Sequence, residues 1–255
     1  MEARAFSPVL KKLIPVLLTI IIVAGLYKYY GAWAYTVKNL AEFFRLTFEH
    51  LLLVLVSMAA AVTVGVGLGT LMTRKRFAHL APAIMGVVNV WQSVPSLGVI
   101  ALAYGFLPLL GLSGIGVVPA LIALFFHAVA PIVRNTYAGI QSVSKDVIEA
   151  ATGMGMSPKQ ILFRIELPNA LPVIMGGVRT STAIIVGTAP LAFLIGGGGL
   201  GFWIFTGIAL MDMGIMMAGA VPVALIAMLA DSALARTEKI VVSKGIQAEE
   251  YQVAM

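Results

Sequence analysis

The chain has 255 residues, of which 60% are hydrophobic and only 11% are charged, and its mean hydropathy is +1.00. This composition predicts an all-α polytopic membrane protein and excludes an ordinary soluble enzyme, while the absence of cysteine excludes disulfides and thiolate chemistry. The net charge of +6 does not indicate a nucleic-acid partner, because the basic residues lie at the ends of apolar segments, where they orient a protein in a membrane.

Six apolar segments are long enough to cross a bilayer, since a transmembrane helix needs about 20 residues. They lie near 13–33, 51–72, 82–108, 116–138, 172–195 and 214–235. We therefore predict about six transmembrane helices. We divide the chain into an N-terminal transmembrane anchor with an outer connector at 1–44, a transmembrane domain at 45–236, and a cytoplasmic C-terminal tail at 237–255.

Two interpretations fit the first segment. The basic pair Lys11-Lys12 before the apolar run and an A-x-A sequence at 32–34 are typical of a cleavable signal peptide. Four aromatic residues instead favour the interfacial belt of a retained span, which is the interpretation we prefer: Tyr27, Tyr29, Tyr30 and Trp33. Residues 35–50 are then expected to form a polar, partly amphipathic connector along the outer surface.

The third segment combines a mid-segment proline, Pro95, with uncharged polar side chains, and the fifth segment carries several hydroxyl groups. Proline frees backbone carbonyls, and non-helical backbone in a membrane lies only against protein or a water-filled cavity. These side chains are expected either to line a translocation pathway or to join helices by hydrogen bonds. Our candidates for the pathway are Asn89, Gln92, Ser93, Pro95, Ser96, Thr182 and Thr188.

Groups that carry chemistry are sparse. No carboxylate lies in the middle of a predicted span, which argues against a proton-coupled carrier, and we expect His127 to be a packed, hydrogen-bonded core residue rather than a ligand. The G-x-G-x-x-G pattern at 196–201 follows an apolar span rather than a strand, so it does not indicate a dinucleotide site. We predict no catalytic residues, no metal and no cofactor in this chain. Because the sequence has no P-loop, another polypeptide must bind any ATP that is used.

The polar loop at 143–170 predicts two short helices. Ser157 and Gln160 have the spacing of a capping box, with Pro158 at the first helical position. Ser144 is expected to cap an earlier helix that contains Glu149.

Local sequence also predicts how this helix pair turns and ends. Gly153 and Gly155 lie between the two helices, where a turn needs a residue that tolerates positive φ. The second helix is expected to end at Leu167-Pro168, because the residue before proline avoids the α region. Its apolar stripe of Ile161, Leu162 and Ile165 predicts a protruding helix pair that needs a soluble partner.

Lysine and arginine residues predict the orientation. With six spans, the termini, the 73–81 loop and the 143–170 loop fall on one side of the membrane. That side carries Arg4, Lys11, Lys12, Arg74, Lys75, Arg76, Lys145, Lys159, Arg164, Arg236, Lys239 and Lys244. The opposite side carries only Lys28, Lys38 and Arg45. By the positive-inside rule, both termini and the 143–170 loop are expected to be cytoplasmic.

The loop contains the spacing E-A-A-x3-G-x9-I-x-L-P, which resembles the cytoplasmic EAA loop of bacterial type I ABC-importer permease subunits, the binding-protein-dependent transport inner-membrane components. All seven positions of the pattern are present: Glu149, Ala150, Ala151, Gly155, Ile165, Leu167 and Pro168. In that family the loop forms short helices that dock on an ATPase. The resemblance therefore implies the type I permease fold and assigns ATPase coupling to these residues.

Four further stretches resemble the osmoprotectant branch of that family, whose members import glycine betaine, carnitine or choline. They are QSVPSLG at 92–98, PIVRNTYAGI at 131–140, LPNALPVIMGGVRTS at 167–181 and IGGGGLGFWIFTGI at 195–208. The similarity covers residues 45–236, and Gly197 stands where the branch commonly has alanine.

This resemblance implies a multi-pass protein of the bacterial cytoplasmic (inner) membrane, in contact with membrane lipid. It implies three kinds of protein partner: ATPase subunits that hold ATP and Mg, a second permease subunit that is a copy or a paralogue, and an extracytoplasmic solute-binding protein. Two alternatives stay open, which are a permease for another small solute such as methionine or a sulfonate, and a self-sufficient carrier or channel.

Overall fold

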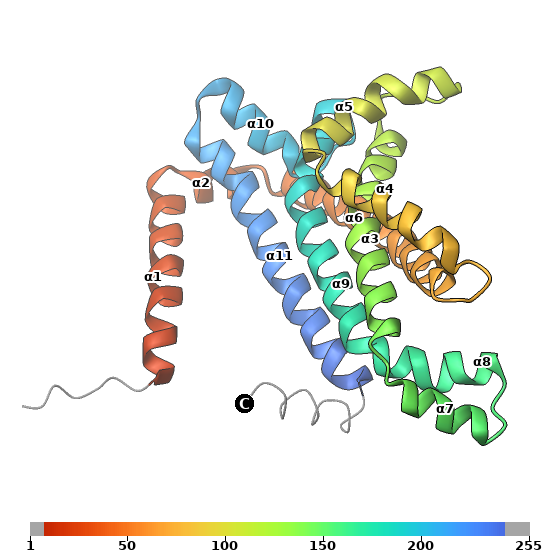
Figure 1. Ribbon diagram of the computed structural model, residues 1–255. Helices are drawn as coiled ribbons and strands as arrows, with labels where there is room; N and C mark the ends of the chain where they lie inside the picture. The colour runs from red at the N-terminus through yellow and green to blue at the C-terminus, as the bar shows by residue number, and fades with distance from the viewer. Residues whose placement is uncertain (1–7, 243–255) are drawn as a thin grey trace, which may run out of the picture.

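The computed structural model describes residues 8–242, and every regular element in this range is a helix (Figure 1). The first half forms α1 (Pro8–Tyr29), α2 (Ala32–Lys38), α3 (Leu40–Met72), the 3-10 helix η1 (Ala78–Leu80), α4 (Ala81–Gln92), α5 (Ser96–Phe106) and the 3-10 helix η2 (Leu107–Leu110). The second half forms α6 (Val117–Gln141), α7 (Lys145–Gly153), α8 (Pro158–Ile161), the π-helix η3 (Leu162–Glu166), α9 (Leu167–Thr188), the 3-10 helix η4 (Ala189–Ile195), α10 (Gly201–Leu210) and α11 (Met213–Val241). The predicted all-α class is confirmed. Arg4 and Lys244, which enter the orientation prediction, lie outside the described residues, as does most of the predicted tail at 237–255.

Four stretches are each long and apolar enough to cross a membrane alone: α3, α6, the continuous run Pro158–Ile195, and α11. Two helix pairs pass the same test but are bent, by 64° between Leu17–Tyr29 and Ala32–Lys38, and by 105° between Ala78–Gln92 and Ser96–Leu110. Counting each bent pair as one span gives six within the part of the chain that the structure describes, in agreement with the predicted number.

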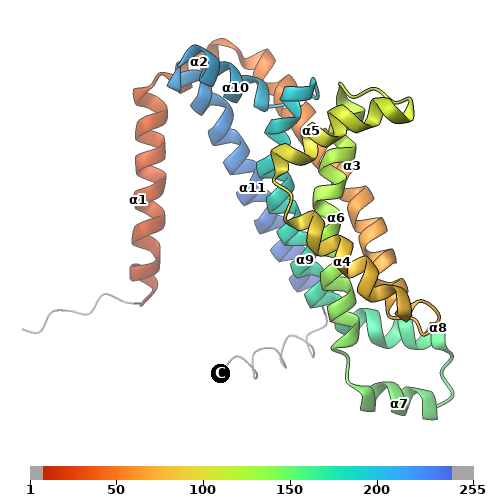
Figure 2. The same ribbon diagram turned by 45° about the horizontal axis from the view of Figure 1, so that its top comes forward.

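The third predicted span is broken at the expected place. α4 ends at Gln92, and Pro95 has the extended backbone angles φ −57° and ψ 142° immediately before α5. Proline lacks a backbone N–H and disfavours the α conformation in the residue before it, so the helix cannot continue through this position. The bend of 105° is much sharper than an ordinary proline kink, and α4 and α5 run in clearly different directions (Figure 2).

The predicted connector at 35–50 is helical from Leu40 onward, because α3 begins there and runs without a break into the second predicted span. Two carboxylates anchor these first turns of α3 to the distant glycine-rich loop and the helix that follows it. The Trp203 indole Nε1 donates to Glu42 at 3.0 Å, and the backbone N–H of Gly199 donates to Glu49 at 2.9 Å. These contacts join residues 150 and 161 positions apart in the sequence, so no local pattern could indicate them.

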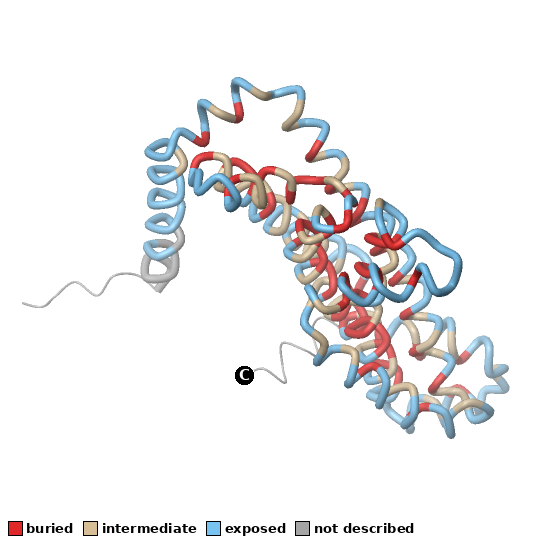
Figure 3. The backbone as a smooth tube through the Cα atoms, turned by 90° about the horizontal axis from the view of Figure 1, so that it is seen from above, coloured by how far each residue is buried: buried red, intermediate tan, exposed pale blue. Residues whose placement is uncertain are grey.

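The core lies where α3, α6 and α9 pack side by side, as both ribbon views show (Figures 1 and 2). Small buried residues recur every four positions along α3, at Ala61, Gly65 and Gly69, and they allow α6 to approach closely. By contrast, α1 stands apart and most of its described length is coloured as exposed (Figure 3). Large apolar side chains such as Ile21 are exposed along it. The α7–α8 helix pair protrudes at the end of the molecule opposite to α2 and α10 (Figure 1).

Candidate functional site

The protruding helix pair is a compact hairpin whose turn is closed by backbone hydrogen bonds. The N–H of Gly155 donates to the carbonyl of Thr152 at 2.9 Å, and the N–H of Met156 donates to the carbonyl of Ala151 at 3.1 Å. This is the Schellman arrangement of a helix C-terminus, and it requires a left-handed residue at the position of Gly155. Gly155 has φ +78°, as the arrangement demands. Gly153, in contrast, is the last helical residue of α7 and has no positive φ, so the prediction for this glycine is wrong.

The second helix of the hairpin begins with the predicted capping box. The side chain of Gln160 accepts from the N–H of Ser157 at 2.7 Å, and the hydroxyl of Ser157 accepts from the N–H of Gln160 at 3.4 Å. Pro158 occupies the first turn, where its missing N–H has no cost. Ser144 occupies the N-cap position of α7 as predicted, but its side chain makes no capping hydrogen bond.

The apolar stripe of the hairpin turns inward. Ile161 is buried, Leu162 and Ile165 are half-buried, and Ala151 from α7 is buried as well. The large apolar side chains that the hairpin exposes are others, namely Val147, Met154 and Phe163. The stripe therefore stabilises the hairpin, and these three side chains form the apolar surface that is free to contact a partner.

The structure gathers the seven residues of the EAA pattern on this hairpin and at its junction with α9. Glu149, Ala150, Gly155 and Pro168 are exposed, Ile165 and Leu167 are half-buried, and Ala151 is buried. The pattern thus mixes surface positions with positions that hold the two helices together.

Leu167-Pro168 does not end a helix, which corrects our prediction. α8 passes through the π-helix η3 directly into α9, and Leu167 has α-helical angles. The wide turn of a π-helix makes room for a proline ring that would otherwise clash with the carbonyl four residues earlier. The side-chain amide of Asn169 donates to the carbonyl of Ile165 at 2.7 Å and so satisfies an acceptor in the disturbed turn. The hairpin is therefore joined to the membrane helix α9 by continuous helical backbone.

An ion pair joins the hairpin to a second membrane helix. Glu166, the last residue of η3, accepts from the guanidinium of Arg74 at 2.6 Å, and the Glu166 side chain is only 11% exposed. Arg74 lies two residues beyond the end of α3, after its C-cap residue Thr73. The ion pair joins positions 92 residues apart, so no local pattern indicates it, and from the sequence Arg74 is only one of the basic residues that orient the protein.

We expect Arg74→Gln to weaken the attachment of the hairpin, because it leaves the Glu166 carboxylate without its partner. Removal of one member of a fully buried ion pair lowers stability by about 3–5 kcal/mol. Because Arg74 is partly exposed to solvent, we expect a smaller loss of about 1–2 kcal/mol. The expected result is an uptake rate about tenfold lower at an unchanged membrane level. Uptake measured in cells, normalised to the amount of protein in the membrane, tests this.

Two further variants control that experiment. Lys75→Gln removes the same charge from the neighbouring exposed residue and is expected to behave like the wild type. Arg74→Gln combined with Glu166→Gln leaves no unpaired charge and is expected to recover most of the uptake. Equal effects of Arg74→Gln and Lys75→Gln, or a double variant no better than Arg74→Gln alone, would contradict a role for the pair.

A second charged group links α9 to α11. Arg179 contacts the carboxylate of Asp231 through two nitrogens, at 3.0 and 3.2 Å, and that of Glu238 at 3.3 Å. No local pattern pairs these residues, because Arg179 lies 52 and 59 positions from its two partners.

The predicted pathway residues do not form one cluster. Thr182 is buried and bonds the carbonyl of Val178 in its own helix, and Thr188 likewise bonds Ile184 in α9. Ser93 bonds the Asn89 carbonyl within α4, while Pro95 and Ser96 mark the break before α5. The pathway assignments of these residues stay predictions.

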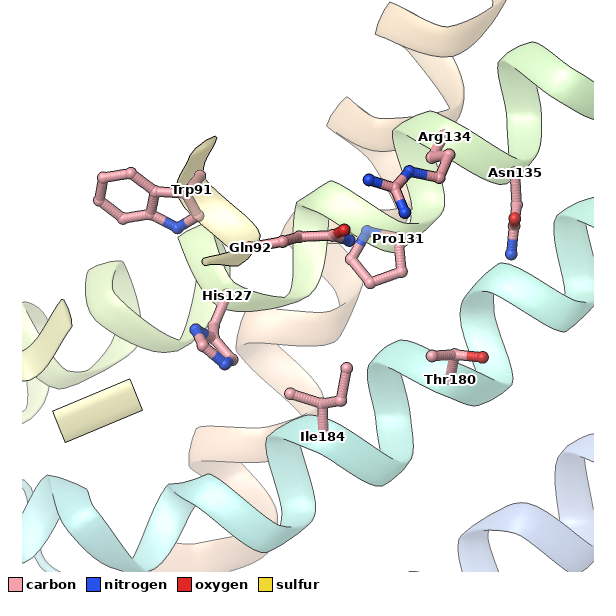
Figure 4. A pocket seen from close by; sticks show the side chains of 8 residues that line it. All are labelled: Trp91, Gln92, His127, Pro131, Arg134, Asn135, Thr180 and Ile184. Carbon is pink, nitrogen blue, oxygen red and sulfur yellow. The ribbon is translucent and has the colours of Figure 1, made fainter. Parts of the chain in front are cut away.

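A pocket of about 440 Å³ lies between α4, α6 and α9 (Figure 4). Its lining consists of Trp91, Gln92, His127, Pro131, Arg134, Asn135, Thr180 and Ile184. Asn89 is not in the lining but accepts a hydrogen bond from Arg134. Of the pathway candidates, only Gln92 is in the lining. His127 lines this pocket, and its buried Nδ1 has no hydrogen-bond partner among the described residues, so it is not the satisfied core residue that we expected.

Residues 65–241 match the family described as binding-protein-dependent transport system inner membrane component, and the chain belongs to this family. It is the permease component of an ABC transporter, a multi-pass inner-membrane protein that is not itself the ATPase.

Among curated relatives, the chain is 44% identical over 209 residues to the choline transport system permease protein OpuBB of Bacillus subtilis (strain 168). This alignment covers 82% of this chain and 93% of that protein. The glycine betaine/carnitine/choline transport system permease protein OpuCB of the same organism matches with the same identity and coverage. The osmoprotectant import permease protein OsmY of Salmonella typhimurium is 47% identical over 187 residues, or 73% of this chain and 77% of that protein.

A solved structure of the MetNI methionine ABC transporter in an inward-facing conformation contains a chain of the same fold. The TM-score between the two chains is 0.71 at 24% sequence identity, and the match covers 81% of this chain and 99% of the chain in the solved structure. The predicted type I permease fold is therefore confirmed.

Proposed function

We propose that this chain is the membrane-spanning permease subunit of an ATP-driven importer for quaternary-ammonium osmoprotectants such as glycine betaine, choline and carnitine. The observation that carries the proposal is the 44% identity to two permeases whose names state these solutes. The alignment covers 82% of the chain and so includes the hairpin, the pocket and the glycine-rich loop.

In this proposal the hairpin docks on a separate ATPase subunit that binds ATP and Mg. Val147, Met154 and Phe163 offer the apolar contact surface, and Glu149 offers a charge beside it. Movement of the hairpin reaches α9 through the continuous η3 backbone and reaches α3 through Arg74. A second permease subunit completes the pathway, and an extracytoplasmic binding protein delivers the solute.

The function is tested by uptake of radiolabelled glycine betaine in cells that carry the complete transporter, with and without an inactivated ATPase partner. We expect ATPase-dependent uptake that excess unlabelled choline or carnitine suppresses and excess methionine or taurine does not. Suppression by methionine or taurine alone would assign the permease to another solute. Uptake that persists without the ATPase would indicate a self-sufficient carrier.

The proposed orientation places the hairpin in the cytoplasm and the turn before α11 outside. The absence of cysteine allows two matched single substitutions in exposed positions, Met154→Cys and Met211→Cys, which are 74% and 93% exposed. In intact cells we expect a membrane-impermeant thiol reagent to label Met211→Cys strongly and to leave Met154→Cys unlabelled until the membrane is permeabilised. Labelling of Met154→Cys in intact cells would reverse the proposed orientation.

A further inference from the structure

We propose that the pocket between α4, α6 and α9 binds the transported zwitterion by its two ends, with the solute carboxylate at Arg134 and its quaternary ammonium at Trp91. This inference rests on the proposed function, and it adds a site of contact and a direction in which the solute lies. The pocket volume of about 440 Å³ falls in the range of small-molecule sites.

Arg134 provides the cationic end. Figure 4 shows its guanidinium and the side-chain amide of Gln92, both in the pocket lining, pointing toward each other. Arg74 and Arg179 are held by carboxylates, whereas Arg134 makes its hydrogen bond to the neutral Asn89 amide, and no carboxylate in the described part of the chain is ion-paired with it. An arginine whose charge is uncompensated by a carboxylate is well suited to bind one, because the planar guanidinium matches carboxylate geometry.

Trp91 provides the aromatic end. Its ring packs on Phe126 with centroids 5.3 Å apart, and Phe126 in turn packs on Phe125 at 5.2 Å. A tryptophan face attracts quaternary ammonium groups more strongly than the other aromatic side chains do.

The residues between the two ends are uncharged. Gln92, Asn135 and Thr180 offer hydrogen-bonding groups, and Figure 4 shows the Asn135 side chain pointing toward Thr180. The lining contains no acidic residue. A pocket with one cationic end, one aromatic end and no carboxylate fits a solute that brings its own negative charge, and it holds that solute without a fixed anion to trap its ammonium group.

The two ends make different predictions for two solutes, since glycine betaine has a carboxylate and choline does not. We expect Arg134→Gln to lower glycine betaine uptake about tenfold relative to choline uptake. Trp91→Leu is expected to lower uptake of both solutes about tenfold and to leave the ratio of the two uptake rates unchanged. Trp91→Phe retains an aromatic ring and is expected to retain most of the uptake of both solutes. Arg134→Lys retains the charge and is expected to shift the ratio less than Arg134→Gln.

The experiment measures uptake of both radiolabelled solutes through the complete transporter with its unchanged binding protein. Because both solutes are measured on the same variant, their ratio does not depend on how much of that variant folds. Arg45→Gln removes an arginine that lies outside the pocket and is ion-paired on α3, and it is expected to leave the ratio at the wild-type value. An unchanged betaine-to-choline ratio in Arg134→Gln, or a shift of equal size in Arg45→Gln, would overturn this site alone. Failure of the wild-type transporter to move either solute would overturn the proposed function and this inference with it.

Discussion

Gly155→Trp is expected to leave the protein in the membrane and to abolish ATP-driven uptake. Gly155 lies at the tip of the hairpin in the left-handed conformation, and a Cβ atom added there would meet nothing within 4 Å. The indole would therefore project into the space that a docked partner occupies. Overpacking costs about 1–3 kcal/mol, which weakens docking by up to about a hundredfold. Uptake and stimulated ATPase activity of the complete transporter measure the effect.

A series at this position separates backbone strain from bulk. Asparagine tolerates the left-handed conformation and is expected to behave almost like glycine, while alanine bears a strain of about 1–2 kcal/mol but adds little volume. The expected order of uptake is Gly155, then asparagine, alanine and tryptophan. Normal uptake with normal ATPase stimulation in Gly155→Trp would show that the hairpin tip does not dock.

Gly69→Leu is expected to prevent the protein from accumulating in folded form. A Cβ atom at Gly69 would lie 2.5 Å from the Cβ of Thr136 and 3.0 Å from the carbonyl oxygen of Val133, both on α6. Neither the β-carbon nor the carbonyl is the movable end of a long side chain, so α3 and α6 would have to separate. Ordinary overpacking lowers folding stability by about 1–3 kcal/mol. We expect Gly69→Leu to cost more than this, because the contact between α3 and α6 is central to the core.

The same helix offers a matched control for this prediction. Gly67 is exposed, and an added Cβ atom would meet nothing within 4 Å, so Gly67→Leu is expected to match the wild type. The amount of protein in the membrane and the temperature at which detergent-solubilised protein aggregates compare the two variants. If Gly69→Leu is as abundant and as heat-resistant as Gly67→Leu, close packing at the small residues of α3 is not required.

Local patterns predicted those parts of the fold that local forces control. The capping box at Ser157 and the turn at Gly155 form between residues a few positions apart, so their geometry follows from residue type. The break at Pro95 follows from the missing N–H of one residue, and the number of spans follows from the length of apolar runs. The EAA spacing identified the hairpin because all its residues belong to one short stretch.

By itself, then, the sequence determined the all-α membrane class, the hairpin and the family, all of which are encoded over short distances or in whole-chain composition. Only the tertiary structure joined Arg74 to Glu166, tied Glu49 to the glycine-rich loop, and brought Trp91, Arg134 and Thr180 around one pocket. Only in the tertiary structure does the helix continue through Leu167-Pro168, because a π-helix there accommodates a proline that local preference would place at a helix end. The physical reason is common to these cases: each contact is stabilised by groups that chain folding brings together, and neither partner alone has a pattern that specifies the other.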